Sequence, residues 1–275
     1  MNQVIVVVAP VGTHLPEGVA NPLSPERIAE ETVACAEAGA SMVHLHVRDL
    51  QGALTDDTTV YSRTLDLIRE RSDMIIQGST GGVSALSLEE RCTALNDPRT
   101  EVASLNMGSA NFDEGVYINT LPDIRYWAGR MAETGTVPEL EIFECGMVNN
   151  VQILRDEGAL RGPFNYAFCP GFRGALPVSA DGMYFFKTIL PPGAHWGMNH
   201  HDMSDLSLLA TAVGMGAGFV RVGFEDGVCW APGKTAARNA ELVEKIVSLI
   251  RLMGREIATP TEARELLGVP PLGSS

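Results

Sequence analysis

Two histidines two residues apart are the first candidates for chemistry. His44 and His46 lie at the end of an apolar run that reads MVHLHVRD, and the alternation of side chains along a strand places both imidazoles on one face. Two neutral imidazoles that converge on one point are typical of a metal site, and zinc is an ion that nitrogen ligands favour. The alternative is a pair of hydrogen-bonded core histidines. We expect the metal site if this strand faces the interior of a barrel.

Three charged residues follow a later apolar run. Arg221, Glu225 and Asp226 stand in RVGFEDG, where a glycine lets backbone and ligand approach closely. Charged groups that leave an apolar strand are costly to place without a function. We expect Glu225 to be the third zinc ligand, with one coordination position open for a substrate oxygen, and Asp226 to act as a general base beside Arg221. The alternative is an exposed loop with a simple ion pair.

Small polar residues at two other strand ends could hold a substrate acid. Ser79 and Gly82 lie in QGSTGG, where glycines beside hydroxyls expose backbone N–H groups to an anion such as a carboxylate. A tight turn would have the same sequence. Ser104 and Asn106 share one face of the next apolar run, so both can donate hydrogen bonds to a bound acid if that face is the interior.

Two glutamates alternate along the run ELEIFE. Glu139 and Glu141 therefore share one side of a strand. A carboxylate inside a barrel must be paired, protonated or bound to a metal, which makes Glu141 a candidate for orienting a catalytic group. Exposure of both glutamates at an edge is the alternative.

The other histidines and one arginine have less definite roles. His14 follows the first apolar run, so we expect it to project over the same mouth and to contact the substrate. His195, His200 and His201 cluster near a later run, and each could equally be a solvated loop histidine. Arg173 is a further cation that could favour an acidic substrate side chain.

These residues must be positioned by elements that alternate along the chain. Eight short apolar runs each precede a segment of helical length, about 34 residues per pair, which favours an α/β fold with a single (β/α)8 TIM barrel over residues 1–275. The expected strands are Val4–Ala9, Met42–Val47, Met74–Ser79, Val102–Asn106, Leu140–Phe143, Phe164–Cys169, Ala194–Met198 and Gly218–Val222. The expected helices are Pro25–Ala38, Val60–Arg71, Ser87–Ala94, Asp123–Thr134, Met147–Glu157, Asp181–Thr188, Asp205–Gly214 and Lys234–Met253. A capping box at Thr259–Glu262 predicts an extra C-terminal helix.

Composition limits the partners. The chain has 20 Lys and Arg against 34 Asp and Glu, a net charge of −14, so we expect no nucleic-acid or membrane partner, and an anionic substrate needs a local positive site. Five widely spaced cysteines without a CxxC pair indicate reduced thiols and a cytoplasmic protein. The first apolar run has no basic flank and is broken by Pro10 and Gly12, so we do not expect a signal sequence.

Several of these segments together resemble a known family, the β-keto acid cleavage enzymes. The motifs that carry the resemblance are AEAGASMVHLHVRD, STGG, ASLNMGSANF, PELEIFECGM, RVGFEDG and SLIRLMGREIATPTEARELLG. The resemblance implies a zinc-bearing (β/α)8 barrel that condenses a β-keto acid with acetyl-CoA as cosubstrate and releases acetoacetate and a new acyl-CoA. It also implies a homo-oligomer.

The resemblance implies a role for each matching residue. The zinc ligands would be His44, His46 and Glu225, the catalytic residues Asp226, Arg221, Glu141 and Ser79, and the groups that hold the keto acid Ser79, Gly82 and Ser104. In this scheme zinc polarises the β-carbonyl and Asp226 removes the proton between the two carbonyls. The carbanion then attacks acetyl-CoA, CoA passes to the keto carbon, and a retro-Claisen step splits the product.

Departures from the family pattern fall where the acyl side chain is chosen. Members that accept an amino-substituted keto acid carry an acidic residue at the position of His14, so we expect this chain to disfavour cationic substrates. The segments 169–175 and 197–202 also depart from the pattern. Two other classes of function stay open: a zinc-dependent amidohydrolase-type barrel hydrolase, and a non-catalytic barrel that binds a metal or a small acid.

Overall fold

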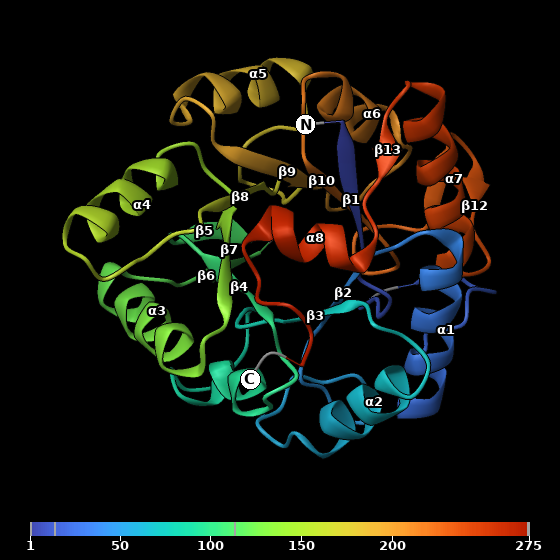
Figure 1. Cartoon of the computed structure of the whole chain (residues 1–275), viewed down its shortest axis with the longest axis horizontal. Coiled ribbons are helices and arrows are strands. Elements are labelled where there is room, and N and C mark those ends of the chain that lie inside the picture. The colour runs from blue at the N-terminus through green and yellow to red at the C-terminus, as the bar shows by residue number, and fades with distance from the viewer. Residues whose placement is uncertain (1, 14, 113, 274–275) are drawn as a thin grey trace.

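Eight parallel strands close into a barrel in the computed structural model, which describes residues 2–13, 15–112 and 114–273 (Figure 1). The barrel strands are β1 (Gln3–Val8), β2 (Met42–Leu45), β3 (Ile75–Gly78), β4 (Val102–Asn106), β7 (Val137–Ile142), β8 (Asn165–Phe168), β9 (His195–Asn199) and β10 (Phe219–Val222). β10 pairs with β9 on one side and with β1 on the other, so the sheet has no free edge. The predicted TIM barrel is confirmed.

Helices surround the strands as a ring (Figure 1). They are α1 (Pro25–Ala38), α2 (Thr59–Arg69), α3 (Leu121–Thr134), α4 (Met147–Asp156), α5 (Ala180–Ile189), α6 (Ser207–Gly214) and α7 (Asn239–Leu252). In α1 the Ser24 side chain accepts a hydrogen bond from the N–H of Arg27, and Pro25 opens the first turn. The strands under this ring are apolar because both of their faces are covered, as in β1, where residues 4–8 are buried.

The last helix covers the N-terminal end of the barrel. α8 (Pro260–Leu267) begins with the predicted capping box and crosses the middle of the ring in Figure 1. Just before it, β13 (Glu256–Ile257) pairs with the start of β1. Nε of Arg264 lies 2.6 Å from Oε2 of Glu101, which precedes β4. Asn165, at the start of β8, donates to the carbonyl of the last residue of α8. The opposite, C-terminal end of the strands is therefore the end available for chemistry.

One expected α-helix is a 3₁₀ helix instead. The segment predicted over 87–94 forms η1 (Glu90–Asn96). Cys92 has φ −106° and ψ 19°, which interrupts the helical hydrogen-bond pattern inside the element.

Two hairpins add short strands that the sequence pattern does not predict. The helix expected from residue 234 begins at Asn239, because the preceding residues form the hairpin of β11 (Cys229–Ala231) and β12 (Lys234–Thr235). A second hairpin, β5 (Ala110–Phe112) with β6 (Gly115–Tyr117), follows β4. Strands of two or three residues are too short to show an alternating pattern.

Candidate active site

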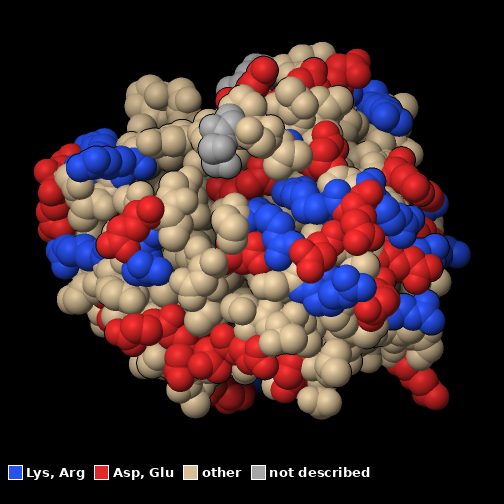
Figure 2. All heavy atoms as spheres, turned by 60° about the horizontal axis from the view of Figure 1, so that its bottom comes forward, with Lys and Arg blue, Asp and Glu red and all other residues tan. Residues whose placement is uncertain are grey.

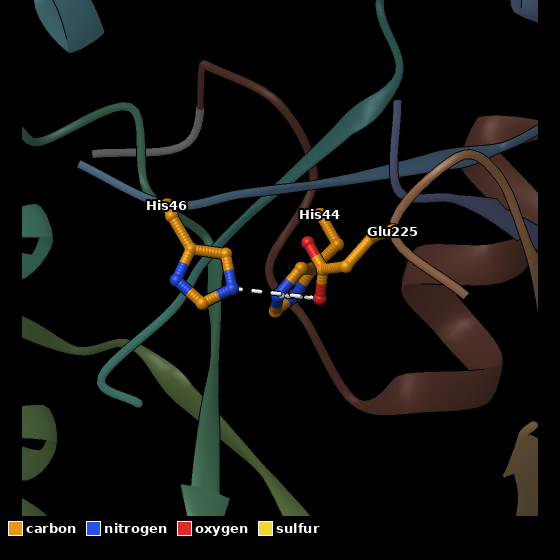
Figure 3. A group of neighbouring side chains, drawn as sticks. All are labelled: His44, His46 and Glu225. Atoms are coloured by element: carbon orange, nitrogen blue, oxygen red, sulfur yellow. Dashed lines mark ion pairs between the residues drawn. The ribbon is translucent and has the colours of Figure 1, made fainter. Parts of the chain in front are cut away.

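Three side chains converge at the C-terminal end of the barrel. His44 is in β2, His46 follows that strand, and Glu225 lies in the loop after β10. The Nε2 atoms of His44 and His46 lie 3.5 and 3.4 Å from Oε1 of Glu225. Figure 3 shows the three side chains pointing toward one another, and their ligand atoms all lie within 4.8 Å. The structure thus brings together the three residues predicted as metal ligands, here called the metal triad.

The metal triad suits a small divalent cation. Ligand bonds of about 2.1 Å at tetrahedral angles place ligand atoms about 3.4 Å apart, which is close to both distances from Glu225. Nδ1 of His44 lies 2.8 Å from Oε1 of Gln77, so an N–H there turns Nε2 toward the triad. Burial lowers the pKa of His44 to about 3, which keeps its imidazole neutral with a free lone pair. Burial opposes ionisation of Glu225, but the adjacent histidines and Arg221 hold its pKa well below the usual range.

A buried arginine–carboxylate pair lies beside the metal triad. Nε and Nη2 of Arg221 lie 2.7 and 2.6 Å from Oδ2 and Oδ1 of Asp226, so both carboxylate oxygens accept from one guanidinium. Nη2 also lies 3.3 Å from Oε1 of Glu225. The Asp226 side chain is 0% exposed, and burial raises its pKa even though Arg221 favours the carboxylate. Arg221 is a cation held in place between the triad and Asp226.

Glu141 faces a cavity of about 460 Å³ that the metal triad and Arg221 also line. Burial raises the pKa of Glu141 to about 8, since desolvation and the neighbouring carboxylates outweigh the attraction of Arg221. A carboxyl group with this pKa can bind or release a proton near neutral pH. Glu139 lies deeper, where its Oε1 accepts from Nδ2 of Asn199 at 3.1 Å. Both glutamates are buried, so the alternative of exposure at an edge is wrong.

The loop after β3 forms one side of the cavity. Ser79, Gly81 and Gly82 line it, and the Ser79 Oγ accepts a hydrogen bond from the N–H of Gly81 at 3.1 Å. Gly82 has φ +130°, and a Cβ there would lie 2.5 Å from Cδ1 of Leu54. Only glycine suits this backbone conformation and this close packing. The loop can therefore present polar groups to an acid in the cavity.

Two predicted substrate contacts lie one layer behind that surface. Ser104 is buried, with its Oγ 3.5 Å from Oγ of Ser79 and its carbonyl accepting from the Thr80 hydroxyl. Asn106 is also buried, and its Oδ1 accepts from the N–H of Gly108 at 3.1 Å. Neither belongs to the described residues that line the cavity. In this structure they support the loops around it.

The remaining candidates are dispersed. His14 lies outside the described residues, so its substrate selectivity stays a prediction. His195 is at the start of β9, where Nδ1 lies 2.8 Å from Oδ1 of Asn165 at the opposite end of the barrel. His200 is buried, so a solvated loop position is wrong for it. His201 lines the cavity. Arg173 forms an exposed ion pair with Glu114.

Several cavity residues were not predicted. Arg48 continues the alternation of His44 and His46 by two residues, so the strand period could have identified it. Four aromatic residues, Phe112, Tyr117, Phe143 and Phe172, line the cavity from separate loops and hairpins. No single periodic pattern in the sequence connects them.

Comparison with known proteins gives consistent results over nearly the whole chain. The family model described as beta-keto acid cleavage enzyme matches residues 3–269. The 3-keto-5-aminohexanoate cleavage enzyme of Fusobacterium nucleatum is 35% identical over 273 residues, which covers 98% of this chain and 99% of that protein. The 3-oxoadipate:acetyl-CoA acetyltransferase of Cupriavidus necator is 32% identical over 278 residues, which covers 98% and 96% of the two chains.

A solved structure shares the fold. ObcA, in a ternary complex with a C4-CoA adduct and oxalate, superposes with a TM-score of 0.75 at 22% identity, over 90% of this chain and 67% of that one. This similarity supports the barrel architecture. Since the family model covers almost all of the sequence, and two curated relatives exceed 30% identity over nearly its full length, the chain belongs to the β-keto acid cleavage enzymes and is an acyl-CoA-forming transferase.

Proposed function

We propose that this protein is a zinc-dependent enzyme that converts a β-keto acid and acetyl-CoA into acetoacetate and a new acyl-CoA. The observation that carries the proposal is the metal triad, which lies at the mouth of the barrel in one cavity with Glu141 and Arg221. The names of two relatives support acetyl-CoA as cosubstrate: the acetyltransferase from Cupriavidus and the 3,5-dioxohexanoate:acetyl-CoA acetone transferase of Paraburkholderia graminis.

Residues of the cavity divide the task of binding the keto acid. His44, His46 and Glu225 would hold the zinc ion, which when bound supplies a Lewis acid toward the β-carbonyl. Ser79 and the backbone around Gly82 would hold the substrate carboxylate, because Ser79, Gly81 and Gly82 line the cavity. The carbon between the two carbonyl groups would then lie between this loop and the triad.

The geometry favours Glu141 as the group that removes the proton from this carbon. The sequence points to Asp226 as the base, but both oxygens of Asp226 accept from Arg221 and its side chain is 0% exposed. Glu141 borders the cavity directly. We assign Asp226 a positioning role, in which it holds the Arg221 cation toward the negative charge that develops during proton removal.

The proposed reaction balances without an oxidant or reductant. The deprotonated carbon attacks the acetyl carbonyl of acetyl-CoA, and CoA leaves as a thiolate. The thiolate attacks the original ketone, the bond between that carbon and the former nucleophilic carbon breaks, and an acyl-CoA is released. The acetoacetate enolate takes back the proton from Glu141, which restores the enzyme.

A product analysis tests this proposal. The purified protein is incubated with zinc, acetyl-CoA and a panel of β-keto acids, and new acyl-CoA esters are identified by mass spectrometry. We expect acyl-CoA and acetoacetate in equal amounts, and neither without acetyl-CoA. Turnover without any thioester would indicate the hydrolase alternative. Metal binding without turnover on the whole panel would indicate the non-catalytic barrel.

We also propose that the protein acts as a homo-oligomer in the cytoplasm. All five cysteines are free thiols, which suits a reducing compartment. Val116 and Ile118 are large apolar side chains that are 55% and 59% exposed, and exposed apolar surface is typical of an interface. Light scattering of the purified protein tests the assembly, and a molecular mass of 29.5 kDa in solution would contradict it.

A further inference from the structure

Four aromatic side chains form one wall of the active-site cavity. Phe112 and Tyr117 come from the β5–β6 hairpin, Phe143 follows β7, and Phe172 follows β8. All four line the same cavity as the metal triad. We call them the aromatic wall.

The aromatic wall is packed as a unit. The rings of Phe112 and Phe172 are stacked, with centroids 3.8 Å apart and an angle of 25° between planes. The ring centroid of Phe143 lies 5.6 Å from that of Phe112 and 5.2 Å from that of Phe172. The ring centroid of Tyr117 lies 5.3 Å from that of Phe112. Because each ring rests on its neighbours, the wall is formed before any ligand enters the cavity.

Two neighbouring loops fix the position of Phe172. The imidazole of His201, in the loop after β9, stacks on Phe172 with centroids 4.0 Å apart and planes 5° apart. Gly171 has φ +113°, and a Cβ there would lie 2.0 Å from the carbonyl oxygen of His201, so the two loops are in close contact. The N–H of His201 also donates to the carbonyl of Pro170 at 3.0 Å. The outer face of the wall is thereby held by backbone contacts as well as by stacking.

The charged residues of the cavity lie near the metal triad. They have other roles than binding a charged substituent of the substrate. Among the described residues that line it, Glu141 and Glu225 are the carboxylates, and both have roles in the proposed chemistry. Among the described residues of the cavity lining, an ammonium group on the substrate therefore has no separate counter-charge at the aromatic wall.

The cations near the cavity are paired with carboxylates or lie on the side of the metal triad. Arg221 is paired with Asp226. Arg48 donates to the carbonyl of Gly52 at 2.7 Å and interacts electrostatically with Glu225, which places it on the side of the triad. Arg173 forms an exposed ion pair with Glu114. A carboxylate at the far end of a substrate would thus meet aromatic rings at the wall, whereas Arg48, which borders the cavity on the side of the triad, has only the carbonyl of Gly52 as a side-chain hydrogen-bond partner among the described residues.

We propose that the aromatic wall receives the substituent on the keto carbon and that the preferred substrates are β-keto acids with an apolar substituent. This inference rests on the proposed function. A neutral alkyl or aryl group gains free energy when it leaves water for such a surface, whereas a charged group loses hydration without a partner.

Three six-carbon substrates test the proposal because they differ mainly in charge. They are 3-oxohexanoate, 3-oxoadipate and 5-amino-3-oxohexanoate. With acetyl-CoA, 3-oxohexanoate gives acetoacetate and butanoyl-CoA. We expect its kcat/KM to exceed those of the other two by at least tenfold. A higher kcat/KM for 3-oxoadipate or for the amino acid would overturn the proposal, while the formation of their acyl-CoA esters would still support the proposed function. If no substrate yields acyl-CoA, the proposed function itself fails.

A pair of phenylalanine variants tests the wall. Phe172→Ala is expected to lower kcat/KM for 3-oxohexanoate about tenfold, mainly through KM, and Phe172→Leu is expected to retain most of it. Phe185→Ala is the matched control, since Phe185 is exposed on α5 and outside the cavity lining. Circular dichroism checks that each variant is folded. If kcat/KM for each of the three substrates is the same in Phe172→Ala as in the unchanged protein, the substituent binds elsewhere.

Discussion

At the scale of single residues, the site combines a metal triad with a buried network that sets proton affinities. The same desolvation that keeps His44 neutral raises the pKa of Glu141 to about 8. One change of environment would thus prepare both the proposed metal ligand and the proposed proton acceptor. Arg221 acts on both, since its charge lowers the pKa of each.

Removal of two triad residues should remove the metal. In His44→Ala/His46→Ala, metal content measured by mass spectrometry is expected to fall from about one zinc per chain to background, because one carboxylate cannot hold the ion alone. His195→Ala is the control, since that imidazole bonds to Asn165 at the other end of the barrel. Full occupancy in the double variant would show that the metal is held elsewhere.

The two candidate bases can be separated by proton exchange. Without acetyl-CoA, the enzyme should catalyse exchange of the C2 protons of a β-keto acid with deuterated water. We expect Glu141→Gln to lower this exchange and kcat by at least about 10²-fold. Asp226→Asn should lower kcat as well but retain measurable exchange, because the cavity-facing carboxylate remains. If Asp226→Asn loses exchange and Glu141→Gln retains it, Asp226 is the base, as the sequence suggests.

The raised pKa of Glu141 also makes a prediction about stability. In the unfolded chain this carboxyl loses its proton at a pH near its ordinary pKa, whereas in the folded protein its pKa is about 8. Between these two pH values the folded state therefore binds more protons than the unfolded state. Stability of the metal-free protein should therefore fall as pH rises from 5 to 8. Urea unfolding should show a loss of unfolding free energy that is about 3 kcal/mol smaller in Glu141→Gln than in the unchanged protein. Equal losses in both proteins would contradict the assignment.

At the scale of elements, the ends of the barrel strands position the proposed catalytic groups, and the loops after them line the rest of the cavity. β2 and the loop after β10 supply the metal triad, and β7 supplies Glu141. The loop after β3 supplies the polar rim, and the β5–β6 hairpin and the loops after β7 and β8 supply the aromatic wall. Substrate preference can therefore change through the loops without a change in the triad.

The loop after β3 should be sensitive to a single added methyl group. Gly82→Ala forces an L residue to φ +130° and pushes Leu54, another cavity residue, out of place. We expect KM for the keto acid to rise about tenfold or more. Gly254→Ala is the control, because that glycine has φ +77° and nothing within 4 Å of the added atom. It should cost about 1 kcal/mol of stability and leave KM unchanged.

Much of the fold was predictable because its elements are long enough to repeat a pattern. The eight strands and α1 follow from apolar runs and caps, and the capping box of α8 appears as expected. The hairpin of β5 and β6 was not predicted, since three residues contain less than two full alternations. The helix expected at 87–94 is a 3₁₀ helix because of the local backbone geometry at Cys92. Residue helix propensities do not predict this geometry.

The site was predictable to the extent that local spacing determines it. His44 and His46 share a face through the strand period, and Glu225 follows a strand that ends at the same mouth. The aromatic wall was not predictable, because its rings come from separate loops that only the closed barrel brings together. The placement of Asp226 behind Arg221 also depends on side-chain packing that sequence spacing does not contain.

At the scale of the whole molecule, the proposed function requires an acidic protein to bind an acidic cosubstrate. The net charge is −14, and on the face in Figure 2 basic and acidic side chains are interspersed, with acidic groups gathered along the lower part of the view. Among the described residues, each helix is too short or too polar to cross a bilayer.

Added salt should therefore improve the binding of acetyl-CoA. Raising KCl from 20 to 200 mM screens the repulsion between the protein and the phosphates of acetyl-CoA, so KM for acetyl-CoA should fall about twofold or more. Acetyl-pantetheine, which has no phosphate, is the control, and its KM should stay constant. A rise in KM for acetyl-CoA with salt would indicate a local basic site that outweighs the net charge.

Helix α8 has a kinetic consequence. It lies across the N-terminal end of the barrel, bonded to residues at the starts of β4 and β8, while the reactive groups lie at the other end. The two reactants and the two products must therefore enter and leave through the same, C-terminal end of the barrel. In the proposed binding mode the keto acid would lie deeper than acetyl-CoA, so it should enter first, and acetoacetate should depart after the acyl-CoA. In product-inhibition experiments, acetoacetate should therefore compete with the keto acid. The acyl-CoA should not compete with the keto acid, as in an ordered kinetic mechanism.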